Sequence, residues 1–446
     1  MTETTHSVAA REKATTLPLG PYPRIVTRNI DVPGIAHIDV YRERGGYEAL
    51  ARALKDFSPE QLVEEVKKAG LRGRGGAGFA TGMKWSFLPP TSPKPRYLIV
   101  NCDESEPGTF KDRMLMELNP HLLVEGVIIA SYATKVHHAF LYIRGELPYA
   151  RRQVERAVEE ARAAGFIGEQ IQGSDFDLQI TVSGGAGAYI CGEESALMES
   201  LEGKRGYPRL KPPFPAVVGL YGGPTVINNT ETIATLPAIV SLGAETYAAY
   251  GTERSRGTRI FCLSGHVNRP GNYELPLGTP LRVLIEDFGG GVRGNKRLKA
   301  VIPGGSSVPY LTPDKLDTPL DFESIAAAGS MLGSGGVIVL DEDTCIVGAT
   351  LRMTEFYRDE SCGKCTPCRE GTYWLVQLLE RLEHGEGRES DLDLLNDICD
   401  NIAGKSFCPL GDAATSSIVS SIKLFRDEYL HHVSAHTCLV GPRRSV

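Results

Sequence analysis

Apolar and polar residues along the chain form blocks that predict helices and strands in turn. Ser58-Pro59 is typical of a helix start, and the apolar residues that follow recur at helical spacing until Gly70. Residues 96–101 form a short apolar run without that spacing, which predicts a buried strand.

The alternation continues toward the middle of the chain. It predicts a helix at 121–134, a strand at 138–143, a helix at 148–164 and a strand at 176–183. Alternating helices and strands indicate an α/β fold with a mostly parallel sheet and helices on both faces. Ligands of such sheets bind at the carboxyl ends of the strands, so the loops there are the expected site.

Two further regions have different patterns. Residues 258–340 predict a small mixed β domain, with a helix near 279–288 and strands near 298–302 and 336–340. Residues 345–432 are dominated by helical periodicity and predict a bundle. We expect four parts: an extended N-terminal arm at 1–45, an α/β domain at 46–250, a mixed β domain at 251–342 and a helical bundle at 343–446.

Charge and hydropathy exclude several functional classes. The net charge of −7 and the pI near 5.9 leave no basic field, which argues against nucleic acid as the main ligand. The first 20 residues lack the apolar core of a secretory signal, which favours a cytoplasmic location. The apolar stretch at 122–133 is interrupted by Glu125 and is shorter than the roughly 20 residues of a spanning helix. We therefore expect any membrane role to depend on partners.

Four cysteines carry the clearest chemical signal. Cys362, Cys365 and Cys368 are separated by two residues each, and Cys408 is followed by Pro409. A triplet plus a distant Cys-Pro is typical of iron–sulfur ligation, whereas zinc ribbons, the main alternative, usually have two separate C-x-x-C pairs. The other cysteines lack paired spacing, and most of them are interpreted as buried free thiols: Cys102, Cys191, Cys262, Cys345, Cys399 and Cys438.

A glycine-rich loop at 73–78 matches the pattern G-x-G-x-x-G. The loop follows a predicted helix and not a strand, so a standard dinucleotide-binding turn is not expected. Its bare backbone N–H groups, with Arg72, Arg74 and Lys84 nearby, still suit a flat or phosphorylated ligand. The alternative is a mobile surface loop.

Acidic residues gather at the same predicted edge of the sheet. Residues 101–108 bring three carboxylates directly after a strand, and Glu193-Glu194 follow a second glycine-rich loop at 183–192. Three functional interpretations remain open: a divalent metal site, acid–base catalysis, or acceptors for ribose hydroxyls and ring N–H groups. Solvated acidic loops are the alternative.

Other segments would also suit a nucleotide. Lys211 and Phe214 lie in a proline-rich stretch, and residues 225–232 are dense in uncharged hydrogen-bonding groups. Phe79 and Phe87 are able to stack on a purine, although isolated aromatic residues more often belong to a core.

Five segments, in order, resemble the NADH-binding flavoprotein subunit of respiratory complex I, the 51 kDa or F-type family. The resemblance extends from about residue 46 to 432 and is carried by residues 70–79, 101–108, 187–194, 208–215 and 360–371. It implies noncovalent FMN, NADH and a [4Fe–4S] cluster. It also implies a Rossmann-like domain, a ubiquitin-like β-grasp domain of the soluble-ligand-binding type and a C-terminal helical bundle.

The resemblance also assigns residues position by position. FMN would be held by Gly73, Gly75, Gly76, Lys84, Asn101, Asp103, Gly192, Glu193, Asn228, Asn229 and Thr232. NADH would be surrounded by Phe79, Phe87, Glu106, Tyr189, Glu194, Lys211 and Phe214, with Glu106 and Tyr189 as the catalytic pair. The cluster would be ligated by Cys362, Cys365, Cys368 and Cys408.

The activity implied by the resemblance is NADH dehydrogenation. A hydride would pass to FMN, and electrons would leave singly through the cluster toward quinone. The expected partners are the 24 kDa-type [2Fe–2S] subunit and the 75 kDa-type iron–sulfur subunit, at the inner face of the cell membrane. The alternative is a diaphorase subunit of an NAD-linked hydrogenase or formate dehydrogenase, which the lack of a second cysteine cluster disfavours. We expect Glu194 or Glu106 to favour NADH over NADPH by repelling an extra phosphate.

Overall fold

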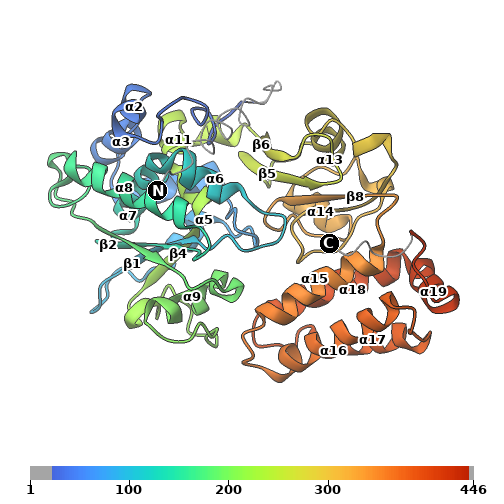
Figure 1. Ribbon diagram of the computed structural model, residues 1–446. Helices are drawn as coiled ribbons and strands as arrows, with labels where there is room; N and C mark the ends of the chain where they lie inside the picture. The colour runs from blue at the N-terminus through green and yellow to red at the C-terminus, as the bar shows by residue number, and fades with distance from the viewer. Residues whose placement is uncertain (1–22, 441–446) are drawn as a thin grey trace, which may run out of the picture.

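The computed structural model describes residues 23–440, and its first domain is built on a four-stranded parallel sheet (Figure 1). The strands are β1 (Tyr97–Cys102), β2 (His138–Ile143), β3 (Gln179–Gly184) and β4 (Thr225–Asn229), in the order β3-β2-β1-β4. All pairs are parallel, and Asn101 and Asn229 are register partners at the carboxyl ends of β1 and β4. The parallel α/β prediction is confirmed.

Helices surround this sheet. They are α3 (Glu48–Asp56), α4 (Pro59–Ala69), α5 (Thr81–Trp85), α6 (Lys111–Leu118), α7 (Pro120–Thr134), α8 (Pro148–Ala163), α9 (Glu194–Leu201), α10 (Thr230–Ala234), α11 (Leu236–Leu242) and α12 (Ala244–Ala248). The predicted start of α4 is confirmed, because Ser58 and Gln61 form a capping box and Gly70 ends the helix in the left-handed region. Helix α6 was not predicted from the sequence.

The two faces of the sheet have different coverings. Leu98 and Val100 of β1 pack into a large core with α7 and α8, while Ile99 points to the other face. That other face is covered by α9 (Figure 1). The four cysteines of the predicted cluster belong to the same group of packed side chains. Because side chains alternate along a strand, one apolar strand contributes to both layers.

The second domain has a mixed sheet, as predicted. Its strands are β5 (Thr258–Gly265), β6 (Gly271–Pro276), β7 (Leu298–Ile302) and β8 (Gly336–Asp341), in the order β6-β5-β8-β7. Only β5 and β8 pair in parallel. The predicted helix near 279–288 is a short α13 (Leu281–Val283) that continues as a π-helical turn at 284–288, and α14 (Phe322–Ala327) covers the same core.

The third domain is the predicted helical bundle. It comprises α15 (Ile346–Glu360), α16 (Thr366–Glu383), α17 (Ser390–Ile402), α18 (Leu410–Leu424) and α19 (Arg426–Ala435). Cys365 is the N-cap of α16, and Cys408 lies two residues before α18. Both ligand loops are thus fixed by helix ends.

The N-terminal arm is only partly extended. Residues 1–22 of the predicted arm lie outside the described residues, and Ile38–Glu43 form helix α2, contrary to the expectation of an extended segment. The Glu274 carboxylate of β6 accepts backbone N–H groups of residues 25–27 at 2.8 to 3.1 Å. The arm therefore joins the first domain to the second.

Among the described residues, no single helix is long and apolar enough to cross a membrane. Helices α6 and α7 pass that test only as a pair, and their axes are bent by 99° at the break.

Candidate functional site

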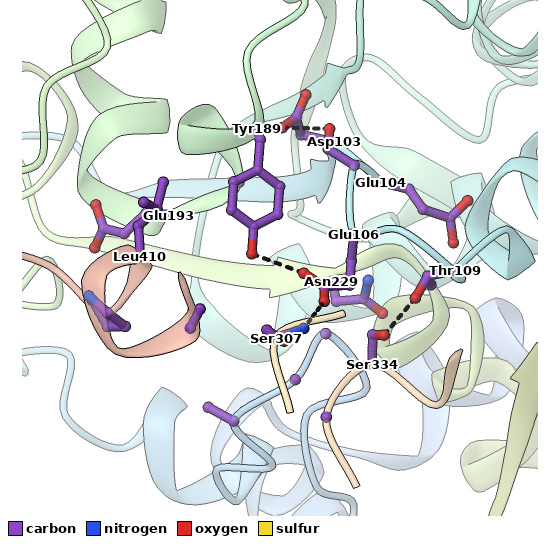
Figure 2. Close-up of a pocket in the computed structure, with 18 of the residues that line it drawn as sticks. Asp103, Glu104, Glu106, Thr109, Tyr189, Glu193, Asn229, Ser307, Ser334 and Leu410 are labelled. Carbon is purple, nitrogen blue, oxygen red and sulfur yellow. Dashed lines mark hydrogen bonds between the residues drawn. The ribbon is translucent and has the colours of Figure 1, made fainter. Parts of the chain in front are cut away.

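One cavity of about 420 Å³ opens at the carboxyl ends of β1 and β4, where the three domains meet (Figure 2). The loops of the first domain line one side of it. Ser307 and Ser334 of the second domain line another side, and Cys408 and Leu410 of the bundle complete it. The cavity lies at the edge of the sheet where the sequence predicts the site.

The first glycine-rich loop lines the cavity through Gly75 and Gly76. Gly76 has a φ of +147°, and a Cβ there would meet no atom within 4 Å. The loop is anchored from behind, because Thr232 Oγ1 accepts the Arg74 N–H at 2.9 Å and the buried Arg74 guanidinium donates to the Thr258 carbonyl at 2.8 Å. The mobile-loop alternative is therefore disfavoured.

Asp103 places an unpaired acceptor in the cavity wall. Its Oδ2 accepts from Ser105 at 3.2 Å, whereas its buried Oδ1 has no hydrogen-bond partner among the described residues (Figure 2). Burial raises the pKa of Asp103 to about 7. Asn101 lies beside it and donates to the Gly192 carbonyl at 2.8 Å, which ties the end of β1 to the second glycine-rich loop.

Glu104 stabilises the first turn of α6. Its carboxylate accepts the N–H groups of Asp112 and Arg113 at 2.8 and 2.9 Å, and burial raises its pKa to about 7. Beside it lies Lys111, which is 1% exposed and forms ion pairs with Asp112 and Glu231, both at 2.8 Å. Sequence reasoning missed this buried cation, although it lines the cavity; its position shortly after the acidic loop was the available signal.

Glu106 and Tyr189, the pair expected to be catalytic, contact each other. The Tyr189 hydroxyl donates to Glu106 Oε2 at 2.8 Å, and the Ser307 N–H donates to Oε1 at 2.8 Å (Figure 2). Burial raises the pKa of Glu106. Because both carboxylate oxygens already accept hydrogen bonds, the geometry favours a positioning role over that of a general base.

The second glycine-rich loop ends in a charged network. Glu193 caps α9 and accepts from Lys211 at 2.8 Å. Glu194 pairs with Lys84 at 3.0 Å and with Lys211 at 2.8 Å. Burial raises the pKa of Glu194, but the two ammonium groups outweigh it and hold that pKa at about 2.

Three of the predicted aromatic residues are exposed and are not part of a core. Phe79, Phe87 and Phe214 are 50%, 53% and 59% exposed. The ring centroids of Phe79 and Phe87 lie 6.0 Å apart, and Lys84 lies between them in the sequence. A large exposed apolar surface is a candidate ligand-binding site, and we refer to these three residues as the aromatic rim.

The cavity separates the predicted residues into two groups. Its lining includes Gly75, Gly76, Asn101, Asp103, Glu106, Tyr189, Gly192, Glu193, Asn229 and Cys408. Outside the lining lie Gly73, Phe79, Lys84, Phe87, Glu194, Lys211, Phe214, Asn228, Thr232, Cys362, Cys365 and Cys368. Asn228 instead accepts the Trp85 indole N–H at 2.9 Å, and so it supports the local structure.

The four cysteines of the sequence motif lie in one side-chain cluster beneath the sheet. Cys408 also lines the cavity, so the cavity and the cysteine cluster share a wall. Burial raises the pKa of Cys368, and it raises that of Cys408 to about 12. Such thiols fit a metal cluster, because bound metal is what stabilises a buried thiolate.

Family models match all three domains. Residues 66–238 match a model described as the Nuo51 FMN-binding domain, and residues 259–339 match an SLBB domain. Residues 348–432, which include the four cysteines, match the NADH-ubiquinone oxidoreductase-F iron-sulfur binding region. These matches confirm the predicted cofactors and decide between iron–sulfur and zinc at this motif.

The chain is also similar to curated proteins along most of its length. It is 58% identical over 408 residues to the F-type subunit of NADH-quinone oxidoreductase from Streptomyces coelicolor, covering 92% of this chain and 90% of that protein. It is 56% identical over 433 residues to the protein of the same name from Mycobacterium tuberculosis, covering 96% and 97%.

Among solved structures, the chain resembles an NAD⁺-reducing [NiFe]-hydrogenase in the H₂-reduced state. The TM-score is 0.79 at 38% identity, covering 85% of this chain and 64% of the hydrogenase chain. A second hydrogenase structure, in the air-oxidized state, gives a TM-score of 0.78 at 34% identity and covers 95% and 72%.

Proposed function

The chain belongs to the family of F-type subunits of NADH-quinone oxidoreductase, and on that premise we propose which of its residues perform the oxidation of NADH. It is an oxidoreductase subunit with an FMN-binding domain and an iron–sulfur region. One observation carries the residue assignment: the cavity lined by the glycine and acidic loops is also lined by Cys408. A ligand in that cavity would therefore lie against a cluster ligand.

The residues of the cavity fit FMN. Gly75 and Gly76 present backbone without side chains, which allows a close approach by a flat ring. The unpaired Asp103 Oδ1 is an acceptor for a ribityl hydroxyl. Asn229, at the end of the neighbouring strand β4, donates one amide N–H to Asp112 and offers the other. When bound, FMN accepts a hydride from NADH, and a [4Fe–4S] cluster accepts single electrons.

NADH would bind at the exposed aromatic rim. Phe79, Phe87 and Phe214 offer ring faces for the adenine. Lys211 would meet the phosphate oxygens of NADH. Glu194 compensates the charge of Lys211 and of Lys84, the lysine assigned to FMN. Glu194 would accept hydrogen bonds from ribose hydroxyls and would repel an added phosphate. This predicts a preference for NADH over NADPH.

Glu106 and Tyr189 would fix the approach of the nicotinamide. Their mutual hydrogen bond and the Ser307 N–H hold the carboxylate in one orientation in the cavity wall. The backbone N–H of Tyr189 donates to Glu360 of α15 at 2.9 Å, so the bundle fixes the same loop. Hydride transfer depends on such positioning more than on proton transfer by the protein.

The cluster would be held by Cys362, Cys365, Cys368 and Cys408, and electrons would leave through the C-terminal bundle. We propose domain limits of 46–250, 251–342 and 343–446. As a family member, the chain functions in a complex with other subunits. We propose that the partners beside the bundle are the 24 kDa-type and 75 kDa-type iron–sulfur subunits, at the inner face of the cell membrane.

A hydrogenase diaphorase is the second candidate, because the solved structures at TM-scores of 0.79 and 0.78 are hydrogenase chains. Sequence identity and coverage favour the F-type subunit of NADH-quinone oxidoreductase. The chain covers 90% to 97% of the F-type relatives at 56% to 58% identity, but only 64% and 72% of the hydrogenase chains at 38% and 34%.

Cys365→Ser tests the path of electrons. We expect NADH to bleach the bound flavin at a normal rate, while electron transfer onward from the chain falls by more than about tenfold. Stopped-flow absorbance measures the first step, and reduction of the reconstituted complex measures the second. Cys399→Ala, a buried thiol of α17, is the control and should leave both steps unchanged. Normal onward transfer in Cys365→Ser would refute the assignment of Cys365 as a cluster ligand.

A further inference from the structure

A second group of metal-ligating side chains lies in the bundle, separate from the four cluster cysteines. The ligand atoms of Cys345, His432 and Cys438 all lie within 4.8 Å of one another. His432 is fully buried, and the other two are partly exposed. We infer that Cys345, His432 and Cys438 form a structural zinc site that fastens the C-terminal segment to the bundle.

The distances agree with tetrahedral coordination. Zn–N bonds of about 2.0 Å and Zn–S bonds of about 2.3 Å place ligand atoms about 3.5 Å apart at a tetrahedral angle. Cys345 Sγ and His432 Nε2 are 3.4 Å apart. The Oε2 atom of Glu383 lies 3.5 Å from Cys345 Sγ but is not one of the three mutually close ligands, so a water molecule would take the fourth position.

The orientation of the His432 ring is an independent sign of metal binding. Its Nδ1 faces the Leu382 carbonyl at 3.2 Å, while its Nε2 faces the sulfur of Cys345. A ring that donates Nδ1–H to a backbone carbonyl has the lone pair of Nε2 free for a metal. Histidine ligands of metal sites are usually fixed in this way.

The site would join segments that are far apart in the sequence. Cys345 caps the N-terminus of α15, His432 lies on α19 and Cys438 follows that helix. Figure 1 shows α19 at the outer end of the bundle. A metal ion there would fix this end, which has only a small apolar core contribution from Tyr429 and its neighbours.

Two thiols at this spacing also allow a different outcome, a disulfide between Cys345 and Cys438. The two states are mutually exclusive, since a disulfide removes both thiolates from the metal. Metal content and thiol oxidation state, measured on the same sample, therefore discriminate between them.

The test is metal analysis of the purified full chain with its cofactors. We expect about one zinc per chain, alongside iron, and zinc X-ray absorption that shows two sulfur ligands at about 2.3 Å and one nitrogen ligand at about 2.0 Å. In Cys438→Ser, zinc should fall at least about tenfold while the iron content stays unchanged. Cys438 follows α19 and is partly exposed, so this variant should fold.

Cys399→Ala serves as the matched control, because it removes a buried thiol of the same bundle outside the Cys345 group. It should keep its zinc. Absence of zinc from the wild-type chain, equal zinc in Cys438→Ser, or a Cys345–Cys438 disulfide found by mass spectrometry would each overturn the proposal.

Discussion

At the scale of single residues, the acidic side chains near the cavity have different structural roles. The sequence alone shows only that these residues lie close together in the chain. Glu104 caps a helix, Glu106 is held by Tyr189, and Asp103 keeps an unpaired oxygen. The sequence placed all three at one strand end. Their division of tasks depends on which N–H or hydroxyl group each oxygen meets, and those groups come from distant segments.

Glu194→Gln tests discrimination between the two nicotinamide cofactors. The substitution removes the carboxylate that Lys84 and Lys211 share. The added phosphate of NADPH would then meet an uncompensated Lys84 ammonium group and a Lys211 ammonium group that keeps only Glu193 as its partner. We expect kcat/KM for NADPH to rise at least about tenfold relative to NADH. Steady-state rates with NADH and with NADPH measure this ratio of kcat/KM values.

Glu202→Gln is the control for this change. Glu202 also has a pKa of about 2, since hydrogen bonds from Lys204 and Arg209 outweigh the effect of its burial, but its ion pairs are with these two residues and not with Lys84 or Lys211. Its variant should keep the wild-type ratio. An unchanged ratio in Glu194→Gln would remove Glu194 from the explanation of cofactor choice.

Asp103→Asn tests the cost of the buried carboxylate. Burial raises the pKa of Asp103 in the folded chain to about 7, so folding favours the protonated carboxyl group. Its contribution to stability is fully present below the pKa of the unfolded chain and is lost as pH rises through 7. Between about pH 5.5 and 8, the free energy of unfolding of the flavin-free variant should rise by about 2 kcal/mol relative to that of the wild type. Thermal melts across this range measure the gain, and a difference independent of pH would contradict it.

At the scale of elements, the sequence predicted helices and strands best where periodicity was strong. The strands β2 and β7 and the helices α7 and α8 agree with their predicted limits to within one residue. Helices α2 and α6 were missed, because short helices carry little periodic signal and are stabilised by tertiary contacts. Glu104, for example, caps α6 from the preceding loop.

Gly76→Ala tests the glycine-rich loop as an element of the flavin site. At a φ of +147° an alanine is strained, and its methyl group would enter open space at the cavity wall. We expect FMN affinity to fall at least about tenfold, measured by fluorescence titration of the flavin-free chain.

Gly168→Ala is the matched control for the loop. Gly168 has a φ of +128° with open space around it, and it lies outside the cavity lining. Its variant carries similar backbone strain but should bind FMN normally. If both variants lost FMN affinity equally, the cause would be general destabilisation and not a change in the flavin site.

At the scale of the whole molecule, the cavity exists because three domains meet. Arg259 of β5 is fully buried and donates to the carbonyl groups of Arg74 and Gly333, which fixes two cavity loops from different domains. The N-terminal arm makes a further connection through Glu274. Domain placement thus depends on buried charged groups that accept or donate several hydrogen bonds each.

Glu274→Ala tests the connection of the arm. Loss of the carboxylate leaves the N–H groups of residues 25–27 without this acceptor, which should destabilise the chain by about 2 to 5 kcal/mol. We expect a lower Tm and faster proteolysis within residues 23–45, measured by limited digestion and mass spectrometry.

Glu286→Ala is the control for the arm. Glu286 pairs with Arg282 on an exposed surface at 2.9 Å, and surface ion pairs contribute little. Its variant should digest like the wild type. Protection of residues 23–45 in Glu274→Ala would show that the arm is held by other contacts.

The sequence by itself determined the α/β class, the order of the domains, the cysteine spacing and the loops that supply the site, because these depend on local periodicity and on residues adjacent in the chain. Tertiary structure decided which of those residues share a cavity. It brought Cys408 to the wall that Gly76 and Asp103 line, buried Lys111 between two carboxylates, and gathered Cys345, His432 and Cys438. Contacts between segments tens to hundreds of residues apart leave no periodic signal, since packing and not spacing creates them.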